Sequence, residues 1–391
     1  MLAFIKEEIT LWEYLKNSVK PIVLYGTGDG ADKVIAHLAI RNIEIAGVFA
    51  SDEFVRGQQF YGHKVRKYSE LLLLDKPVIA LICFASELPG QLERFYRLAK
   101  IHETYAPHVP VFAGDELTDF AWLAKHEKEL QKVYDNLADD FSRQVFAAIL
   151  NYRISGKVTY LKECTTSRST DLKELFAFGN EEVYVDAGAF TGDTVEEFLH
   201  LTDRNYKKIF AVEPDPKNFK KLNAYVRDNK LANVVTVQAG VWSGCGSLEL
   251  TGSGGRQSTL FTNEKRERLD KKLQDEAAAR LRICDNTAIK NRKVKRQQVP
   301  VVTIDRVLEN EHAGYMKFDV EGVEKEALAG AVKHLIPDEK GVLPKLLIAA
   351  YHHDGDIFAL PQLLWQTQPA YKVYLRKHPY IPAWEINIFA K

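Results

Sequence analysis

The chain has 391 residues, 46% hydrophobic and 27% charged, which excludes a disordered or collagen-like chain and predicts two or three globular domains. Lysine plus arginine and aspartate plus glutamate number 53 each, so the net charge is zero and a global basic field for nucleic acid is excluded. Four cysteines without C-x-x-C spacing predict reduced thiols, and two early acids argue against a signal peptide. Because no apolar run approaches the ~20 residues that span a bilayer, we expect a cytoplasmic protein without a membrane span.

The first part of the chain has the pattern of a small α/β domain. Apolar segments of strand type alternate with helical periodicity, which predicts a helix (5–17), a strand (21–26), a helix (33–41), two strands (43–49 and 76–84) and a helix (88–102). This order predicts a Rossmann-like domain with a parallel sheet over residues 1–113.

A helical connector is predicted over residues 114–178. Apolar residues recur at threes and fours from Leu117 to Tyr152, which predicts two helices packed between domains. The polar stretch 164–170 that follows is predicted to be a loop.

The remainder, residues 179–391, predicts a second and larger α/β domain. Its predicted strands cover 182–187, 208–213, 234–241, 315–319, 345–352, 371–377 and 385–390. The last two are separated only by residues 378–384, which is too short for a crossover helix. We therefore predict a mostly parallel sheet that ends in an antiparallel hairpin.

An insertion near residues 252–298 interrupts this second domain. It begins with the flexible sequence Gly252–Gly255, and a helix is predicted over 265–281. Residues 262–298 include twelve lysines and arginines against six acids, but no aromatic residue on which a base could stack. We expect a solvated face or a lid that borders the acceptor pocket, and no nucleic-acid partner.

The strongest motif is Val185–Thr194, VDAGAFTGDT, between a predicted strand and a predicted helix. Small residues there let a ligand approach the backbone, and the start of a helix offers free N–H groups. The next strand ends at Glu213, where an acid can accept hydrogen bonds from ribose hydroxyls. Together the two features favour a nucleotide-type ligand over a simple tight turn with a surface acid.

These segments resemble the class I S-adenosylmethionine-dependent methyltransferases and, more narrowly, the FkbM family. The most distinctive resemblance is Lys317–Glu324, KFDVEGVE, which is similar to the family signature K-x-D-V-E-G-x-E. Further resemblances follow in the family's order at Gln238–Ser243, Val302–Asp305, Ala350–His353 and Tyr371–Arg376. The resemblance covers residues from about 180 to the last one, and it implies a class I methyltransferase domain behind an extra Rossmann-like domain.

The resemblance also implies a binding site for S-adenosylmethionine. The methionine end is expected against the glycine turn, the ribose on Glu213, and the adenine near Asp215 and the end of the third strand. The implied cofactor-binding residues are Asp186, Gly188, Phe190, Thr191, Gly192, Asp193, Glu213, Pro214, Asp215, Ala239 and Gly240.

A hydroxyl acceptor needs a base or a metal, because it is a poor nucleophile at neutral pH. The candidates are Asp319, Glu321, His352 and His353, which follow two strands that are neighbours in this fold class. A carboxylate that orients a histidine would make a general-base pair, with His353 preferred because it lies farther past its strand. Two alternatives stay open: the same residues could ligate a divalent cation, or Asp319 only caps a helix. We assign no metal site from the sequence.

The leading prediction is an O-methyltransferase that acts on a hydroxyl of a sugar, a glycan precursor or a related metabolite. The first domain has a nucleotide-type pattern at Gly26, Gly28 and Ala31, with Asp52 near the acid position, so a nicotinamide- or sugar-nucleotide-dependent enzyme is an alternative. Asp29 would repel a pyrophosphate, which favours a structural or substrate-presenting domain. A non-catalytic binding protein is the third hypothesis. The acceptor and the oligomeric state, including a homo-oligomer, are not fixed by the sequence.

Overall fold

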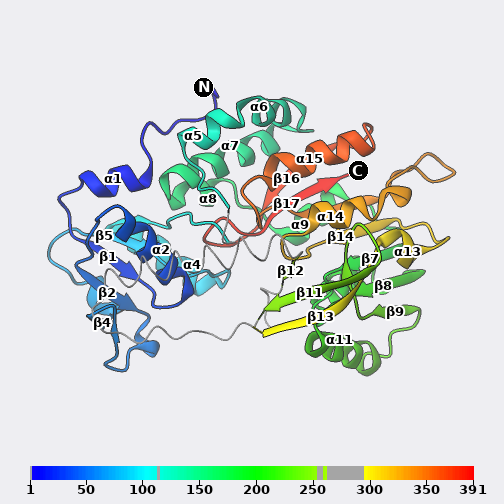
Figure 1. Ribbon diagram of the computed structural model, residues 1–391, viewed down its shortest axis with the longest axis horizontal. Helices are drawn as coiled ribbons and strands as arrows, with labels where there is room; N and C mark the ends of the chain where they lie inside the picture. Colours follow the sequence, from blue (N-terminus) through cyan, green and yellow to red (C-terminus); the bar gives the residue numbers. More distant parts are fainter. Residues whose placement is uncertain (1, 112–114, 253–258, 262–294) are drawn as a thin grey trace.

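The computed structural model describes residues 2–111, 115–252, 259–261 and 295–391. Three sheets organise these residues (Figure 1). The blue N-terminal elements lie on one side of the molecule, the green and yellow elements of the larger sheet lie on the other, and helices α5 to α7 lie above both. Among the described residues, no helix is long and apolar enough to cross a membrane.

The N-terminal sheet has six strands in the order β3-β4-β2-β1-β5-β6, and only the β3–β4 pair is antiparallel. All six predicted elements are present, although the first helix begins at Leu11 and not at residue 5, and the helix after the glycine loop begins at Asp29, earlier than expected. The short β3–β4 hairpin and β6 were not predicted, because strands of two to five residues leave too few positions for a clear period. The elements are α1 (Leu11–Asn17), β1 (Ile22–Tyr25), α2 (Asp29–Ile40), β2 (Gly47–Ala50), β3 (Gln59–Phe60), β4 (His63–Lys67), α3 (Tyr68–Leu71), β5 (Ile79–Ile82), α4 (Pro89–Ile101) and β6 (Glu103–Tyr105).

The connector has more helices than predicted. Three helices replace the two expected before Tyr152: α5 (Phe120–Lys125), α6 (Glu127–Asn136) and α7 (Asp140–Ser155). The predicted loop after them is confined to residues 164–167, because α8 (Val158–Glu163) and α9 (Arg168–Leu175) flank it. Helix α6 packs on α15 and α7 packs on β16, so the connector is built onto the larger domain.

The larger sheet has seven strands in the order β16-β17-β15-β14-β7-β8-β9. Strands β7, β8, β9, β14 and β15 are parallel, and β17 pairs antiparallel with both β15 and β16. The predicted terminal hairpin is therefore confirmed. The elements are β7 (Val183–Ala187), α10 (Asp193–Leu201), β8 (Lys208–Val212), α11 (Pro216–Asp228), β9 (Val234–Val237), α13 (Ile304–Leu308), β14 (Tyr315–Phe318), α14 (Glu324–Ala329), β15 (Lys345–Ala349), α15 (Asp356–Thr367), β16 (Val373–Lys377) and β17 (Ile386–Ala390).

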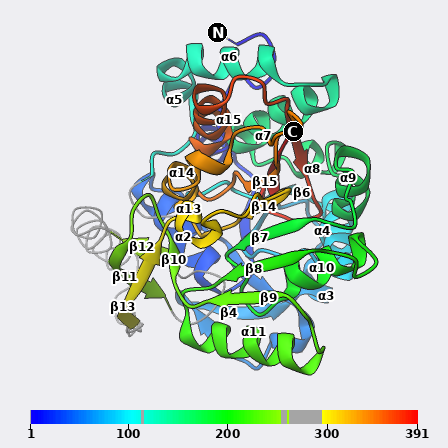
Figure 2. The ribbon, with the colours of Figure 1, turned by 90° about the vertical axis from the view of Figure 1, so that its right-hand side faces the viewer.

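A third, four-stranded sheet was not predicted. The single strand expected over 234–241 is wrong: β9 ends at Val237, and β10 (Gly240–Val241) pairs with β13 (Lys295–Val302) in the new sheet. Strand β13 also pairs with β11 (Gly246–Gly252), which pairs with β12 (Thr259–Phe261). In Figure 2 this sheet stands at one edge of the large sheet, away from α5 and α6. The predicted helix at 265–281 lies outside the described residues.

Polar contacts and a shared hydrophobic core join the N-terminal domain to the connector and the larger domain. One continuous group of buried side chains includes Tyr25 of β1, Phe146 of α7 and Ile388 of β17. His108, after β6, lies 2.9 Å from both carboxylate oxygens of Asp354, at the start of α15. The domains therefore pack as one body, while the boundaries at 113 and 178 stay predictions.

Candidate functional site

A cavity of about 600 Å³ opens at the carboxyl ends of β7, β8, β14 and β15. This is the edge at which ligands bind in open α/β sheets. Its walls come from all parts of the chain, since they include Glu87 and Val111 of the N-terminal domain, Arg168 of the connector and Leu260 of the small sheet. The predicted cofactor turn and the predicted catalytic carboxylates share this one cavity.

The turn after β7 passes close to the neighbouring strand β14. Gly188 has φ +86°, and a side-chain carbon there would overlap the backbone oxygen of Asp319. The N–H groups of Gly188 and Ala189 both donate to the carbonyl oxygen of Val212, each at 3.0 Å. The glycine is therefore required by the chain itself, whether or not a ligand also needs the space.

Gly188→Ala is expected to lower the free energy of unfolding by about 2–4 kcal/mol, because it adds left-handed strain to a backbone overlap. Gly28→Ala is the matched control: Gly28 has φ −98° and nothing lies within 4 Å of an added carbon. The control should change stability by less than about 0.5 kcal/mol in urea denaturation. Equal stability of the two variants would contradict the described turn.

A buried ion pair contacts the backbone of the turn after β7. Asp186, fully buried at the end of β7, lies 3.2 Å from the ammonium of Lys317 on β14, and it accepts a hydrogen bond from the Thr194 hydroxyl at 2.5 Å. Lys317 also donates to the carbonyl oxygen of Gly188 at 3.0 Å. Burial raises the pKa of Asp186, against the lowering effect of Lys317. Asp186 does not line the cavity.

Glu213 follows β8 and holds two loops together. Its Oε2 accepts from the Phe190 N–H at 3.0 Å, and its Oε1 accepts from the Asp215 N–H at 2.9 Å. The residue is 6% exposed and lines the cavity. Burial raises its pKa to about 7, against the hydrogen bonds from Asp215, Asn218 and Phe190, which lower it.

The affinity for S-adenosylhomocysteine is expected to rise about tenfold from pH 6 to pH 8, because a pKa near 7 makes Glu213 mostly ionised only at the higher pH and ribose hydroxyls donate best to a carboxylate. Protein stability should respond in the opposite sense. The folded chain holds this proton more tightly than the unfolded chain does, so the contribution of Glu213 to stability falls as pH rises from 4.5 to about 7. Calorimetry on the protein and on Glu213→Gln checks this, since the variant should lose the pH dependence.

The other predicted cofactor residues divide into two groups. Asp215 does not line the cavity: it caps α11 by accepting from the N–H groups of Lys217 and Asn218. Thr191 and Gly192 also lie outside its lining, and Gly192, at φ +99°, packs against the Tyr225 ring. The lining includes Gly188, Phe190, Asp193, Glu213, Pro214, Ala239 and Gly240.

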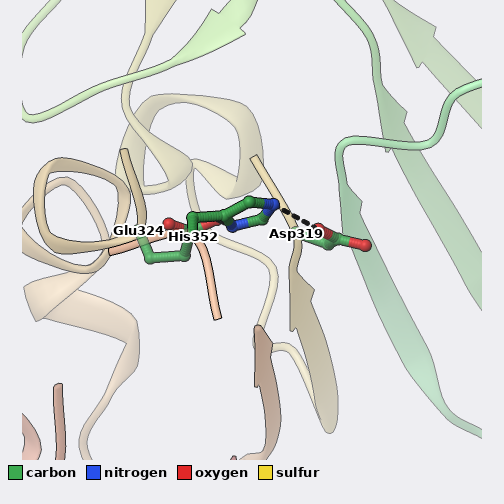
Figure 3. A group of neighbouring side chains, drawn as sticks. All are labelled: Asp319, Glu324 and His352. Carbon is green, nitrogen blue, oxygen red and sulfur yellow. Dashed lines mark ion pairs between the residues drawn. The ribbon is translucent and has the colours of Figure 1, made fainter. Parts of the chain in front are cut away.

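Three of the four predicted catalytic residues meet in the cavity wall. The Nε2 atom of His352 lies 3.7 Å from Asp319 and 3.5 Å from Glu321. Its Nδ1 atom lies 2.9 Å from Glu324, whose side chain is buried at the start of α14 (Figure 3). The Tyr351 hydroxyl also donates to Asp319 at 3.4 Å.

The charges in this group oppose the use of His352 as a base in the unliganded protein. Burial lowers the pKa of His352, but Glu324 and Glu321 outweigh it and hold the pKa well above its usual range. Burial raises the pKa of Asp319, but Lys317 and His352 bring it below its ordinary value, while burial leaves the pKa of Glu321 raised.

His353, the preferred base from the sequence, does not line this cavity. Its Nδ1 lies 2.7 Å from Asp115 and its Nε2 lies 2.9 Å from the carbonyl oxygen of Gly322, in a neighbouring cavity. The chain turns after β15, so consecutive histidines point to different sides. Of the two predicted histidines we therefore now prefer His352 to His353.

Several residues at or next to the cavity were not found from the sequence. Glu324 stands in the matched signature, but its contact with His352 depends on the turn between β14 and α14, where Glu321 has φ +58°. The aromatic rings of Tyr380 and Trp384 lie 5.3 Å apart in the link between β16 and β17. Nothing in the sequence spacing brings that link to the cavity.

Comparisons with known proteins agree with this geometry. Residues 186–363 match the family model described as the methyltransferase FkbM domain. The crystal structure of methyltransferase FkbM from Methylobacillus flagellatus KT is similar over 99% of this chain and 95% of that chain, with a TM-score of 0.67 at 20% identity. A comparison with curated proteins gives no significant match.

More distant similarity is confined to part of the chain. An rRNA methylase from Streptococcus thermophilus covers 57% of this chain and 92% of its own, at 14% identity and a TM-score of 0.33. Aeropyrum pernix fibrillarin with bound S-adenosyl-L-methionine covers 57% of this chain and 73% of its own, at 13% identity and a TM-score of 0.30.

A mostly parallel sheet with an antiparallel terminal hairpin, together with the matched domain, defines an S-adenosylmethionine-dependent methyltransferase. Residues 186–363 match an FkbM methyltransferase domain, and for that domain the predicted family, fold class and cofactor are confirmed. The individual site residues stay predictions.

Proposed function

We propose that the protein transfers the methyl group of S-adenosylmethionine to a hydroxyl of a sugar, a glycan precursor or a related metabolite. The observation that carries this proposal is one cavity lined by two sets of predicted residues. Gly188 and Glu213 of the predicted cofactor site line it, and so do Asp319, Glu321 and His352. A cofactor seated on Glu213 would direct its sulfonium toward the carboxylates.

In this proposal the chain itself contributes position and charge. Glu213 holds the ribose, and the missing side chain at Gly188 lets the methionine end approach the backbone of the turn. One of the two carboxylates, Asp319 or Glu321, receives the proton of the acceptor hydroxyl as the methyl group moves, while His352 keeps both carboxylates in place. The cofactor supplies the activated methyl group.

Part of the cavity lining is suited to a small polar molecule with an apolar face. Tyr380 and Trp384 offer ring surfaces, and Arg168, which also lines the cavity, pairs with Glu197 at 2.8 Å and with Glu385 at 3.5 Å. This combination of rings and fixed charges fits a hydroxylated ring such as a sugar.

The alternative that uses the N-terminal glycine loop has less support. Gly30 is explained by packing, since an added carbon would overlap the backbone oxygen of Cys83. The Asp52 carboxylate accepts from the Ser69 N–H at 3.0 Å, where a ribose acid would have to face a ligand. We therefore propose that this domain forms a wall of the acceptor cavity through Glu87 and Val111.

Thermal shift and methyl-transfer assays test the proposal. S-adenosylhomocysteine should raise the melting temperature and NAD should not, because only a ligand of the native state stabilises it. Incubation with labelled S-adenosylmethionine and a panel of monosaccharides and sugar nucleotides should label a hydroxylated acceptor. Labelling of amine-bearing acceptors alone would contradict transfer to a hydroxyl.

A further inference from the structure

One group of potential metal ligands among the described residues lies at the cavity, and two of its three members line it. Asp319, Glu324 and His352 each offer one ligand atom, and these atoms lie within 4.8 Å of one another. Figure 3 shows the imidazole between the two carboxylates. We propose that this group binds a divalent metal cation next to the cofactor.

Glu324 gives an independent reason to expect a cation. Its side chain is 1% exposed, and its Oε1 accepts from the N–H groups of Val320 and Gly322, at 3.0 and 3.4 Å. Its Oε2 is buried and has no hydrogen-bond partner within the described part of the chain. Because a buried carboxylate oxygen without a partner destabilises a fold, a cation at this oxygen would remove an unfavourable contribution.

The local charges also favour a bound cation. The carboxylates of Asp319, Glu321 and Glu324 surround the one imidazole of His352. The ammonium of Lys317 is shared with Asp186 at 3.2 Å and stands 4.0 Å from Asp319. One imidazole nitrogen and carboxylate oxygens suit Mn²⁺ or Zn²⁺, around which the side chains would close to bonds of about 2.0–2.2 Å.

The position of the group suggests what the ion would do. Asp319 and His352 line the cavity, so an acceptor hydroxyl can reach the ion directly. Coordination lowers the pKa of the hydroxyl, its proton passes to the carboxylate of Glu321, and the oxygen bonds to the methyl carbon as the S–C bond breaks. The electron pair stays on sulfur, which leaves S-adenosylhomocysteine. This role rests on the proposed function, whereas binding of the ion does not.

Metal binding is tested on the full chain without cofactor or acceptor. Protein stripped with EDTA and dialysed is titrated with Mn²⁺, and the free ion is followed by its EPR signal. We expect one strong site per chain, with the affinity lowered about tenfold or more in both Asp319→Asn and His352→Gln. His353→Gln is the matched control, because His353 pairs with Asp115 in the neighbouring cavity, and its affinity should equal that of the unaltered protein.

Circular dichroism checks that each variant is folded before its metal affinity is compared. The side chain of Asp319 is one-third exposed, so the Asp319→Asn variant should fold normally. Absence of Mn²⁺ binding by folded protein up to about 1 mM would overturn the proposal. Unchanged affinity in Asp319→Asn, or a loss confined to His353→Gln, would overturn it equally. Failure to label any hydroxyl acceptor would count against the proposed function alone, because the titration does not depend on turnover.

Discussion

Asp319→Asn and Glu321→Gln are each expected to lower the rate of methyl transfer by ~10²–10⁴-fold. Both carboxylates line the cavity, and both lie near the Nε2 atom of His352, at 3.7 and 3.5 Å. Because the proposal assigns the ribose to Glu213 and not to these two carboxylates, S-adenosylhomocysteine affinity should stay close to that of the unaltered protein. Steady-state rates with saturating cofactor, together with calorimetry, measure the two quantities separately.

His353→Gln is the control for this prediction. It changes the adjacent histidine, which faces Asp115 in the neighbouring cavity, and the rate should change by less than about threefold. The double variant of Asp319 and Glu321 should lose less than the product of the single losses if the two carboxylates act on one proton. Full activity in both single variants would remove these residues from the reaction.

Glu213→Ala should weaken S-adenosylhomocysteine binding by about 2–4 kcal/mol, or roughly 30- to 700-fold in Kd. The substitution removes a carboxylate that is placed for two ribose hydroxyls, and it also frees the loops at Phe190 and Asp215. Isothermal titration calorimetry near pH 8, where Glu213 is ionised, gives the loss directly.

Glu311→Ala is a suitable control for that measurement. Glu311 pairs with Lys207 and Lys208 at the other end of β8, and removing it should leave the cofactor affinity unchanged. A loss of less than about 0.5 kcal/mol in Glu213→Ala would mean that another group holds the ribose.

Sequence patterns predicted the elements whose period is strong and local. The apolar strands β7, β8, β14 and β15 and the order of the final hairpin follow from runs of buried residues and from the short link at 378–384. The small sheet was not predicted because β10 is only two residues long. In addition, β13 pairs with strands some 50 residues away in the chain, and local patterns do not reveal such pairing.

In the candidate site too, contacts between neighbouring strands could be predicted, whereas contacts that depend on loops and distant segments could not. Proximity of Asp319 and Glu321 to His352 could be predicted, because β14 and β15 are parallel neighbours. The choice between His352 and His353 could not, since it depends on how the chain turns after β15 and on Asp115, which comes from a distant segment. The aromatic wall at Tyr380 and Trp384 likewise depends on the path of a link without a period.

A crystal structure of the complex with S-adenosylhomocysteine tests the central claim most directly. The ribose hydroxyls should lie within hydrogen-bond distance of Glu213, and the sulfur should face Asp319 and Glu321 across the acceptor end of the cavity. General-base contact needs hydrogen-bond reach or one intervening water, so the position of the transferred methyl should lie within about 8 Å of one of these carboxylates. A complex with the ribose elsewhere, or with both carboxylates farther than about 8 Å from that position, would contradict the account.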